Sequence, residues 1–167
     1  SSGRGRREAM GCGARTATWN YPLMMAIRKI GPALAAGNTV VIKPAPETPL
    51  TTFALGQLAN EAGLPAGVLN VVAGGDEVGV AMVADPRVRL VSLTGASETG
   101  KAVMRAAADT LKRVHMELGG KAPFVVFADA DIEAAAQGAV VAGFVNTGQD
   151  CTAAPRIYGH RPAFQTL

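Results

Sequence analysis

The chain has 167 residues, 49% of them hydrophobic, and a net charge of +3 at pH 7. This is the length of about one domain with enough apolar residues for a buried core, and two histidines and one tryptophan are too few for the surface typical of nucleic-acid-binding proteins. No apolar run has the length of a membrane span or a signal peptide, and the two cysteines lack CxxC spacing, so we expect a cytoplasmic protein without membrane contact, disulfide or metal site.

Short apolar runs alternate with longer stretches of helical periodicity along the chain. The expected helices are 22–37, 48–65, 77–85, 98–112 and 129–148, with another beginning within 160–167. The expected strands are 38–44, 67–74, 88–95, 113–120 and 122–127. Gly37 and Gly63 are stop signals for the first two helices, and the helix at 129–148 opens with aspartates that can cap it. Strands separated by helices of this length predict βαβ units and an α/β fold with a parallel sheet.

A glycine-rich turn, GASETGK at residues 95–101, separates an expected strand from an expected helix. At such a position the first amides and the dipole of a helix can hold a phosphate group. The turn matches the P-loop pattern G-x-x-x-x-G-K, but Ala102 stands where a P-loop has the serine or threonine that binds magnesium. It also lacks the dinucleotide fingerprint G-x-G-x-x-G. The residues alone leave a phosphate site and a plain turn as alternatives, and they disfavour a P-loop phosphotransferase.

Two residues are candidates for nucleophilic chemistry. Cys151 lies in the small and polar stretch "NTGQDCTAAP", where it could be a buried filler, a metal ligand or a nucleophile. Glu117 lies in "RVHMELGGKAP", where it could solvate a loop, cap a helix or accept a proton. A thiol reacts as its thiolate, so a nearby carboxylate that accepts the proton, directly or through water, would serve such chemistry.

Two further polar residues lie at the ends of expected elements. Asn20, in "TWNYPL", could begin a helix through an Asx-type turn or donate its side-chain amide to an oxyanion. Lys43 ends an expected strand in "VVIKPAPETP". An exposed lysine is usually a solvated charge, but ligands bind at the carboxyl ends of parallel strands, where Lys43 would lie.

Six motifs then follow one another along the chain from about Arg7 to Tyr158. They are "WNYPL", "IGPALAAGNTVVIKPAPETPLT", "GLPAGVLNVVAG", "VSLTGASETGK", "MELGGKAP" and "NTGQDCTAAPRIY". In this order and spacing the chain resembles the NAD(P)-dependent aldehyde dehydrogenases. The stretches "KRVHMELGGKAP" and "GQDCTAA" are similar in particular to those of the 4-aminobutyraldehyde and related aminoaldehyde dehydrogenases.

The resemblance implies a function and roles for the residues that match. The family oxidises an aldehyde to the carboxylic acid with NAD or NADP, through a cysteine thiohemiacetal and a thioester. By resemblance Cys151 is the nucleophile and Glu117 is the general base for the hydrolytic water. Asn20 and the Cys151 backbone amide form the oxyanion hole. Asp150, directly before the nucleophile, would attract the ammonium group of an aminoaldehyde substrate, or else only bind a loop amide.

The resemblance also implies a Rossmann-like sheet that binds the cofactor without the usual fingerprint. The residues carried over to the cofactor are Lys43 at the adenosine ribose, Gly75 and Gly79 at the adenine side, Gly95, Ala96 and Gly100 at the pyrophosphate turn, and Trp19 nearby. Pro46 stands where many members have a glutamate that contacts ribose hydroxyls, with Glu47 displaced by one position. The preference between NAD and NADP is therefore left open.

Two other departures concern the start of the chain and its length. "REAMGCGARTAT", with Thr18 before the tryptophan, stands where the family has a more regular first strand. Family members are much longer than this chain, so we interpret it as a central fragment, with residues 1–118 a partial NAD(P)-binding domain and residues 119–167 the start of the catalytic domain. The full-length form is expected to be a homo-oligomer. The alternative hypothesis is a catalytically dead remnant that acts as a nucleotide-binding or interaction module.

Overall fold

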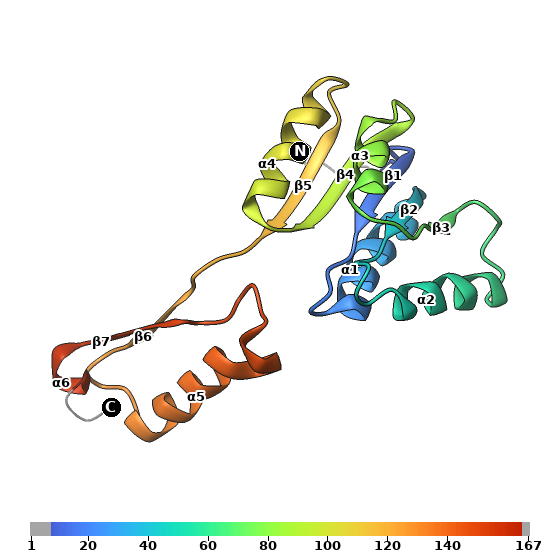
Figure 1. Cartoon of the computed structure of the whole chain (residues 1–167). Coiled ribbons are helices and arrows are strands. Elements are labelled where there is room, and N and C mark those ends of the chain that lie inside the picture. The colour runs from blue at the N-terminus through green and yellow to red at the C-terminus, as the bar shows by residue number, and fades with distance from the viewer. Residues whose placement is uncertain (1–7, 165–167) are drawn as a thin grey trace, which may run out of the picture. The chain divides into compact units, whose positions relative to one another are not determined.

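The computed structural model describes residues 8–164, and the chain divides into two compact units between Leu118 and Gly119. Unit 1 contains five strands and four helices in strict alternation (Figure 1). In chain order they are β1 Cys12–Thr16, α1 Pro22–Ala35, β2 Thr39–Lys43, α2 Leu50–Glu61, β3 Leu69–Val71, α3 Asp76–Ala84, β4 Val88–Gly95, α4 Ser97–Ala108 and β5 Arg113–Leu118. The predicted α/β fold with a parallel sheet is confirmed.

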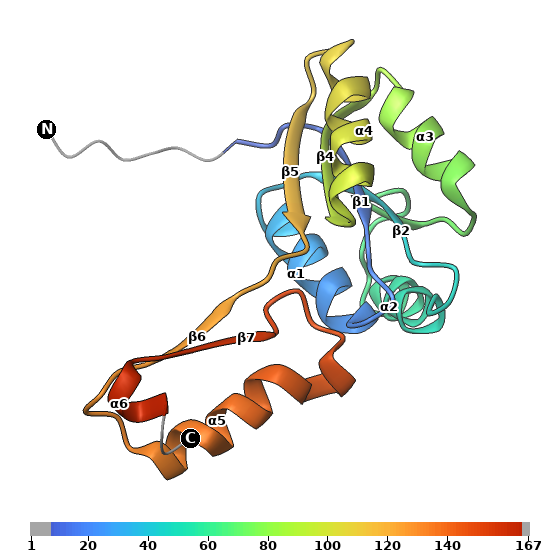
Figure 2. The same ribbon diagram turned by 60° about the vertical axis from the view of Figure 1, so that its left-hand side comes forward.

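The sheet of unit 1 has the strand order β3-β2-β1-β4-β5, and all of its pairs are parallel. The chain moves outward from β1 to β3, returns to the other side of β1 with β4, and ends at β5. Helices α1 and α2 cover one face and α3 and α4 cover the other (Figure 2). The order therefore reverses between β1 and β4, which is where open α/β sheets bind their ligands.

The core of unit 1 lies on both faces of the sheet. On the α1 face, Val40 and Ile42 of β2 are fully buried against α1. On the other face, Ala14 of β1 and Val91 of β4 pack under Val83 of α3. Parallel strands that are covered on both faces read as continuous apolar runs, which is why the β2 and β4 segments were predictable.

Helices α1 and α2 end just before the glycines that the sequence marks as stop signals. Gly37 and Gly63 have φ of +76° and +83° directly after α1 and α2, a backbone conformation that suits glycine. Several bounds differ from the expectation: the helix expected at 48–65 ends at Glu61, the helix expected at 129–148 is α-helical only over Ile132–Phe144, and the strand Arg156–Gly159 was not expected. The strand expected at 67–74 pairs with β2 only over Leu69–Val71, because it is the sheet edge, and the helix expected at 98–112 ends at Ala108, before Leu111 with φ of +52°.

The irregular segment before Trp19 forms the central strand of the sheet. β1 pairs with β2 on one side and with β4 on the other. Its residue Arg15 is only 7% exposed, and its Nη1 donates to the Ala14 carbonyl at 3.3 Å. Burial lowers the pKa of this guanidinium. β1 is therefore formed despite its departure from the family pattern, and the Arg15 guanidinium lies on the sheet face that α1 covers.

Unit 2 is smaller and more open. Its elements are β6 Pro123–Val126, α5 Ile132–Phe144, the 3-10 helix η1 Val145–Gly148, β7 Arg156–Gly159 and α6 Arg161–Phe164. β6 and β7 form a parallel pair, and Asp131 caps α5 by accepting from the Ala134 amide at 3.1 Å, as the sequence predicts. Several large apolar side chains are exposed, namely Val125, Phe127, Val140, Val141, Phe144, Val145, Ile157 and Tyr158. In the described part of the chain, no helix combines the length and apolarity needed to cross a bilayer.

Candidate active site

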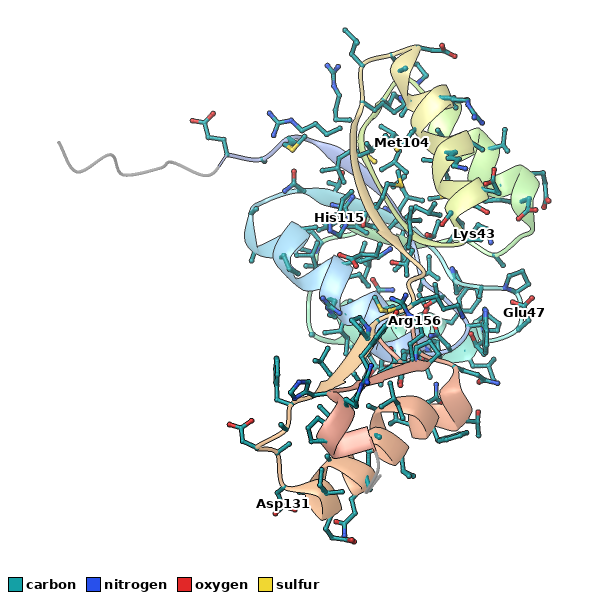
Figure 3. The ribbon with its side chains drawn as sticks, turned by 90° about the vertical axis from the view of Figure 1, so that its left-hand side faces the viewer. Lys43, Glu47, Met104, His115, Asp131 and Arg156 are labelled. Carbon is teal, nitrogen blue, oxygen red and sulfur yellow. The ribbon has the colours of Figure 1, made fainter. Side chains whose placement is uncertain are left out.

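Lys43 lies buried at the carboxyl end of β2. Its Nζ donates to the Gly74 carbonyl at 2.9 Å and to the Pro44 carbonyl at 3.2 Å. A Cβ placed on Gly79 would lie 4.0 Å from Lys43 Cε, so the first turn of α3 passes directly beside the lysine. Figure 3 shows Lys43 at this end of its strand, with Glu47 farther out in the exposed loop toward α2. The structure therefore brings Lys43 together with the Gly74–Gly79 segment.

The turn before α3 is held by Glu77. Its carboxylate accepts from the Gly75 amide at 2.9 Å. Hydrogen bonds from its own backbone amide and from that of Gly75 lower the pKa of Glu77, and the Lys43 ammonium acts in the same direction. This negative side chain at the start of a helix agrees with the helix dipole. Sequence reasoning picked out Gly75 but missed the carboxylate that fixes its conformation.

Gly74 adopts a backbone conformation that other residues avoid, with φ of +149°. A Cβ there would lie 3.1 Å from Val78 Cβ and would collide with a Val78 methyl group. We expect Gly74→Ala to lower the free energy of unfolding of unit 1 by about 2 kcal/mol, from backbone strain and the collision together. Chemical denaturation followed by Trp19 fluorescence measures this loss.

The matched control is Gly63→Ala. Gly63 also has a positive φ, but a Cβ there would have no neighbour within 4 Å. This variant therefore carries the backbone strain alone, and we expect a loss of about 1 kcal/mol. Equal losses in the two variants would contradict the collision with Val78.

The glycine-rich turn joins β4 to α4. Ala96 is the N-cap of α4, and its carbonyl accepts from the Gly100 amide at 3.0 Å. A Cβ on Gly100 would lie 2.8 Å from Leu118 Cδ2, so this glycine lets α4 approach β5 closely. Lys101, the lysine of the apparent P-loop, instead pairs with Glu98 at 2.7 Å on the exposed side of α4.

Two threonines to which the sequence assigned no binding role lie at the topological switch point. Thr94 is near the end of β4, and Thr18 follows the end of β1 by two residues. Their side-chain oxygens are buried without a hydrogen-bond partner among residues 8–164. Buried hydroxyls are normally paired, and the oxygens of Thr48 and Thr52 near the start of α2 share this state, so what distinguishes Thr18 and Thr94 is their place at the switch point. No sequence signal marks them, because threonine is common at strand ends.

Glu117 is half-exposed near the end of β5, opposite Thr94 in the sheet register. Its Oε1 lies 3.3 Å from His115 Nε2. The other ring nitrogen of His115, Nδ1, lies 3.0 Å from Ser92 Oγ on β4. Glu117, the predicted general base, is therefore connected through His115 to Ser92, which is buried in β4.

Lys29 of α1 is buried on the same face of the sheet. Its Nζ donates to the Thr16 carbonyl at 2.7 Å and to the Ser92 carbonyl at 3.2 Å. Burial lowers the pKa of Lys29 to about 7; the positive charge of Arg15 adds to this shift, and the charge of Glu117 opposes it. This buried amine was not predictable, because "IRKIG" is typical of an ordinary amphipathic helix.

Asn20 and Trp19 lie in the turn between β1 and α1. Trp19 is 49% exposed and Asn20 is partly buried. The N-cap of α1 is Tyr21, with Pro22 in the first turn, so Asn20 precedes the cap by one residue. The role of Asn20 as an oxyanion donor stays a prediction.

Cys151 lies exposed in unit 2, after the 3-10 helix η1. The backbone before it turns through a left-handed run, with φ of +50°, +57° and +76° at Asn146, Thr147 and Gly148. Asp150 Oδ1 accepts from both the amide and the hydroxyl of Thr152, each at 2.7 Å. The carboxylate before the cysteine thus binds its own loop, and the role of Asp150 toward a substrate stays a prediction.

The other thiol has a different setting. Cys12 is half-buried and lines a cavity of about 670 Å³ between α3 and the starts of β1 and β4, together with apolar residues such as Val41 and Met82. The lining also includes Val72, Glu77 and Val78, so the cavity runs beneath α3 to the turn that Glu77 holds. Cys12 itself lies at the amino end of β1, whereas Lys43 and Thr94 lie at or near the carboxyl ends of β2 and β4.

The sequence profile described as the aldehyde dehydrogenase family matches residues 3–167, nearly the whole chain. The chain belongs to the aldehyde dehydrogenase family. It is 52% identical to phenylacetaldehyde dehydrogenase of Pseudomonas fluorescens over 97% of its own length and 32% of that protein.

Solved aldehyde dehydrogenase structures have the same fold. A Staphylococcus aureus betaine aldehyde dehydrogenase crystallised with NAD⁺ is 41% identical, with a TM-score of 0.89 over 94% of this chain and 32% of that one. An Escherichia coli NADP-dependent enzyme is 46% identical, with a TM-score of 0.93 over 95% and 33%. This aldehyde dehydrogenase chain therefore spans about a third of the length of its relatives.

Proposed function

We propose that this chain provides the cofactor-binding crevice and the catalytic cysteine of an enzyme that oxidises an aldehyde to the carboxylic acid with NAD⁺ or NADP⁺. Unit 1 is then a partial NAD(P)-binding domain and unit 2 the start of the catalytic domain. The observation that carries the proposal is the exposed Cys151 thiol, in a chain that matches the aldehyde dehydrogenase family from residue 3 to residue 167.

The residues at the switch point fit a dinucleotide. The ammonium of Lys43 uses two of its three donors on backbone carbonyls, which leaves one directed donor for a ribose hydroxyl. The turn at Gly95 and Ala96 leads into the first amides of α4, where a pyrophosphate is favoured, and the buried hydroxyls of Thr18 and Thr94 need polar partners. When bound, the cofactor accepts the hydride from the substrate carbon.

The chain's own residues account for the remaining steps. The Cys151 thiolate adds to the aldehyde carbon, and the resulting oxyanion is stabilised by the Cys151 amide and by the Asn20 side chain. Loss of the hydride leaves a thioester on Cys151. Glu117 then takes a proton from a water molecule, which attacks the thioester and releases the acid and the free thiol.

The decisive experiment measures two steps that need no cofactor, namely acylation of the Cys151 thiol and hydrolysis of the acyl-thiol. An activated ester such as p-nitrophenyl acetate acylates a reactive thiol and releases nitrophenolate in a burst, and hydrolysis of the acyl-thiol sets the later steady rate. We expect a burst in the wild-type chain and in Cys12→Ser, with the acetyl group found on Cys151 by mass spectrometry. We expect no burst in Cys151→Ala, and NAD(P) binding by that variant should be unchanged. A burst that is retained in Cys151→Ala and lost in Cys12→Ser would contradict the proposal.

The cofactor preference is a finer proposal. Pro46 and the exposed Glu47 replace the usual arrangement after Lys43, so the chain has no carboxylate at the position that favours a free ribose 2′-hydroxyl. We expect NAD⁺ and NADP⁺ to bind within about tenfold of each other, as titration calorimetry on the chain would measure. A preference of more than a hundredfold for either would contradict this interpretation.

The substrate class is proposed to be an aminoaldehyde, from the resemblance around Glu117 and Cys151. If Asp150 attracts the substrate ammonium, Asp150→Asn in an enzyme containing this segment should reduce kcat/KM for an aminoaldehyde by roughly 1–2 kcal/mol and leave a neutral aldehyde of similar length unchanged. Steady-state kinetics with both substrates measures this. Equal losses would assign Asp150 to its loop contact with Thr152 alone.

A further inference from the structure

His115 occupies an unusual position between two other polar residues. It lies two residues before Glu117 on β5, so both side chains project from the same face of the strand. Its Nε2 lies 3.3 Å from Glu117 Oε1 and its Nδ1 lies 3.0 Å from Ser92 Oγ. Both nitrogens of one ring are therefore engaged by different partners.

The two partners of His115 differ in their exposure to solvent. Ser92 is 4% exposed in β4, its backbone lies directly opposite His115 in the sheet register, and its carbonyl accepts from Lys29. Glu117 is half-exposed, with 46% of its side chain accessible. Ser92 is thus the buried partner and Glu117 the exposed one, and His115 lies between them.

The chemistry of the groups sets the proton positions. An ionised carboxylate only accepts, so the ring nitrogen that faces Glu117 carries a proton. In the neutral ring Nδ1 then has a lone pair and accepts from the Ser92 hydroxyl. In this tautomer each ring nitrogen faces a partner of complementary polarity.

We propose that His115 is a positioning residue that ties the Glu117 carboxylate to Ser92 and holds it in one orientation. The inference rests on the proposed role of Glu117 as the base that activates water. A base must be within hydrogen-bond reach of the proton that it takes, and a half-exposed glutamate on an edge strand has several rotamers. By restraining the Glu117 side chain, His115 favours one of these rotamers before the thioester forms.

The pairing can be tested without any catalysis. Long-range proton–nitrogen NMR spectra of the chain with labelled histidine resolve both ring nitrogens, and His160→Gln assigns the only other histidine. We expect Glu117→Ala to shift the Nε2 resonance of His115 and leave Nδ1 nearly unchanged, and Ser92→Ala to do the reverse. Glu98→Ala, which removes an exposed carboxylate on α4, should change neither. If Glu117→Ala leaves Nε2 unchanged, the proposal is overturned.

Hydrolysis of the acyl-thiol tests the consequence for the base. We expect His115→Ala to slow the steady rate of ester turnover by about tenfold and leave the burst unchanged, because acylation of Cys151 does not need Glu117 to take a proton from water. His115→Gln places a donor where Nε2 was and should restore most of the rate, whereas His115→Asn replaces only Nδ1 and should not. Equal rates in the Ala, Gln and Asn variants would overturn the positioning role.

The two proposals fail in different ways. Loss of the burst in the wild-type chain would contradict the function of Cys151, while the nitrogen shifts would still decide the contact of His115 with Glu117. A normal burst with unchanged nitrogen shifts in Glu117→Ala would retain the function and reject His115. The experiments therefore separate the role of the cysteine from the role of the histidine.

Discussion

The free energy of unfolding of unit 1 should rise as the pH is raised from about 7 to about 10. Burial lowers the pKa of Lys29 from 10.5 to about 7 in the folded state, whereas the unfolded chain retains the ordinary value. In this window the unfolded state binds a proton that the folded state does not, so deprotonation favours folding. The full difference corresponds to a gain on the order of 5 kcal/mol, complete above the unfolded pKa and absent below about pH 7.

The measurement is chemical denaturation at several pH values, followed by fluorescence of Trp19, the single tryptophan and a reporter of unit 1. Lys29→Met keeps the length of the side chain and should remove this rise in stability. Lys101→Met, which removes an exposed lysine of α4, should retain it. The same slope in Lys29→Met and in the wild type would show that another group causes the pH dependence.

An alanine at position 13 should destabilise unit 1 by about 3 kcal/mol. Gly13 lies in the central strand, and the Arg15 side chain folds back over it on the α1 side of the sheet. A Cβ on Gly13 would collide with Arg15 Nη1 and would lie 2.8 Å from Cζ. Arg15 is only 7% exposed, so its guanidinium cannot move away without disturbing the packing of α1.

Removing the arginine should remove this cost. In an Arg15→Ala background we expect Gly13→Ala to change the free energy of unfolding by less than about 1 kcal/mol, so that the double-mutant cycle has a large coupling energy. Gly95→Ala is the control within the same sheet, because a Cβ there would lie 3.9 Å from Leu93 Cδ1, an ordinary contact. Additive effects at positions 13 and 15 would contradict the steric explanation.

Much of the fold could be predicted because local and global signals agree. The apolar runs of β2 and β4, the glycines that end α1 and α2 and the aspartate that caps α5 each determine their element through nearby residues alone. Lys43 was recognisable from its place at the end of a strand. Its actual partners, the carbonyls of Pro44 and Gly74, depend on where the α3 turn is placed by the fold.

The contacts that were missed arise from strand register. Ser92 and His115 are 23 residues apart, and they meet only because β4 and β5 pair with these residues opposite each other. Within the sequence His115 belongs to no metal-ligand pattern, and no nearby residue points to Ser92 as its partner. The bond from Asp150 to Thr152 is local, but a carboxylate two residues before a threonine can equally face solvent or substrate, so the sequence left both hypotheses open.

The central place of β1 has a consequence for hydrogen exchange. Strand propensity is low in "CGART", yet this segment is hydrogen-bonded to β2 on one side and to β4 on the other. Its amides can reach solvent only when the whole sheet of unit 1 opens, whereas those of β3 and β5, each paired on one side within the described sheet, become accessible through local fraying. The segment with the least strand-like sequence is therefore the one that should keep its deuterium label longest.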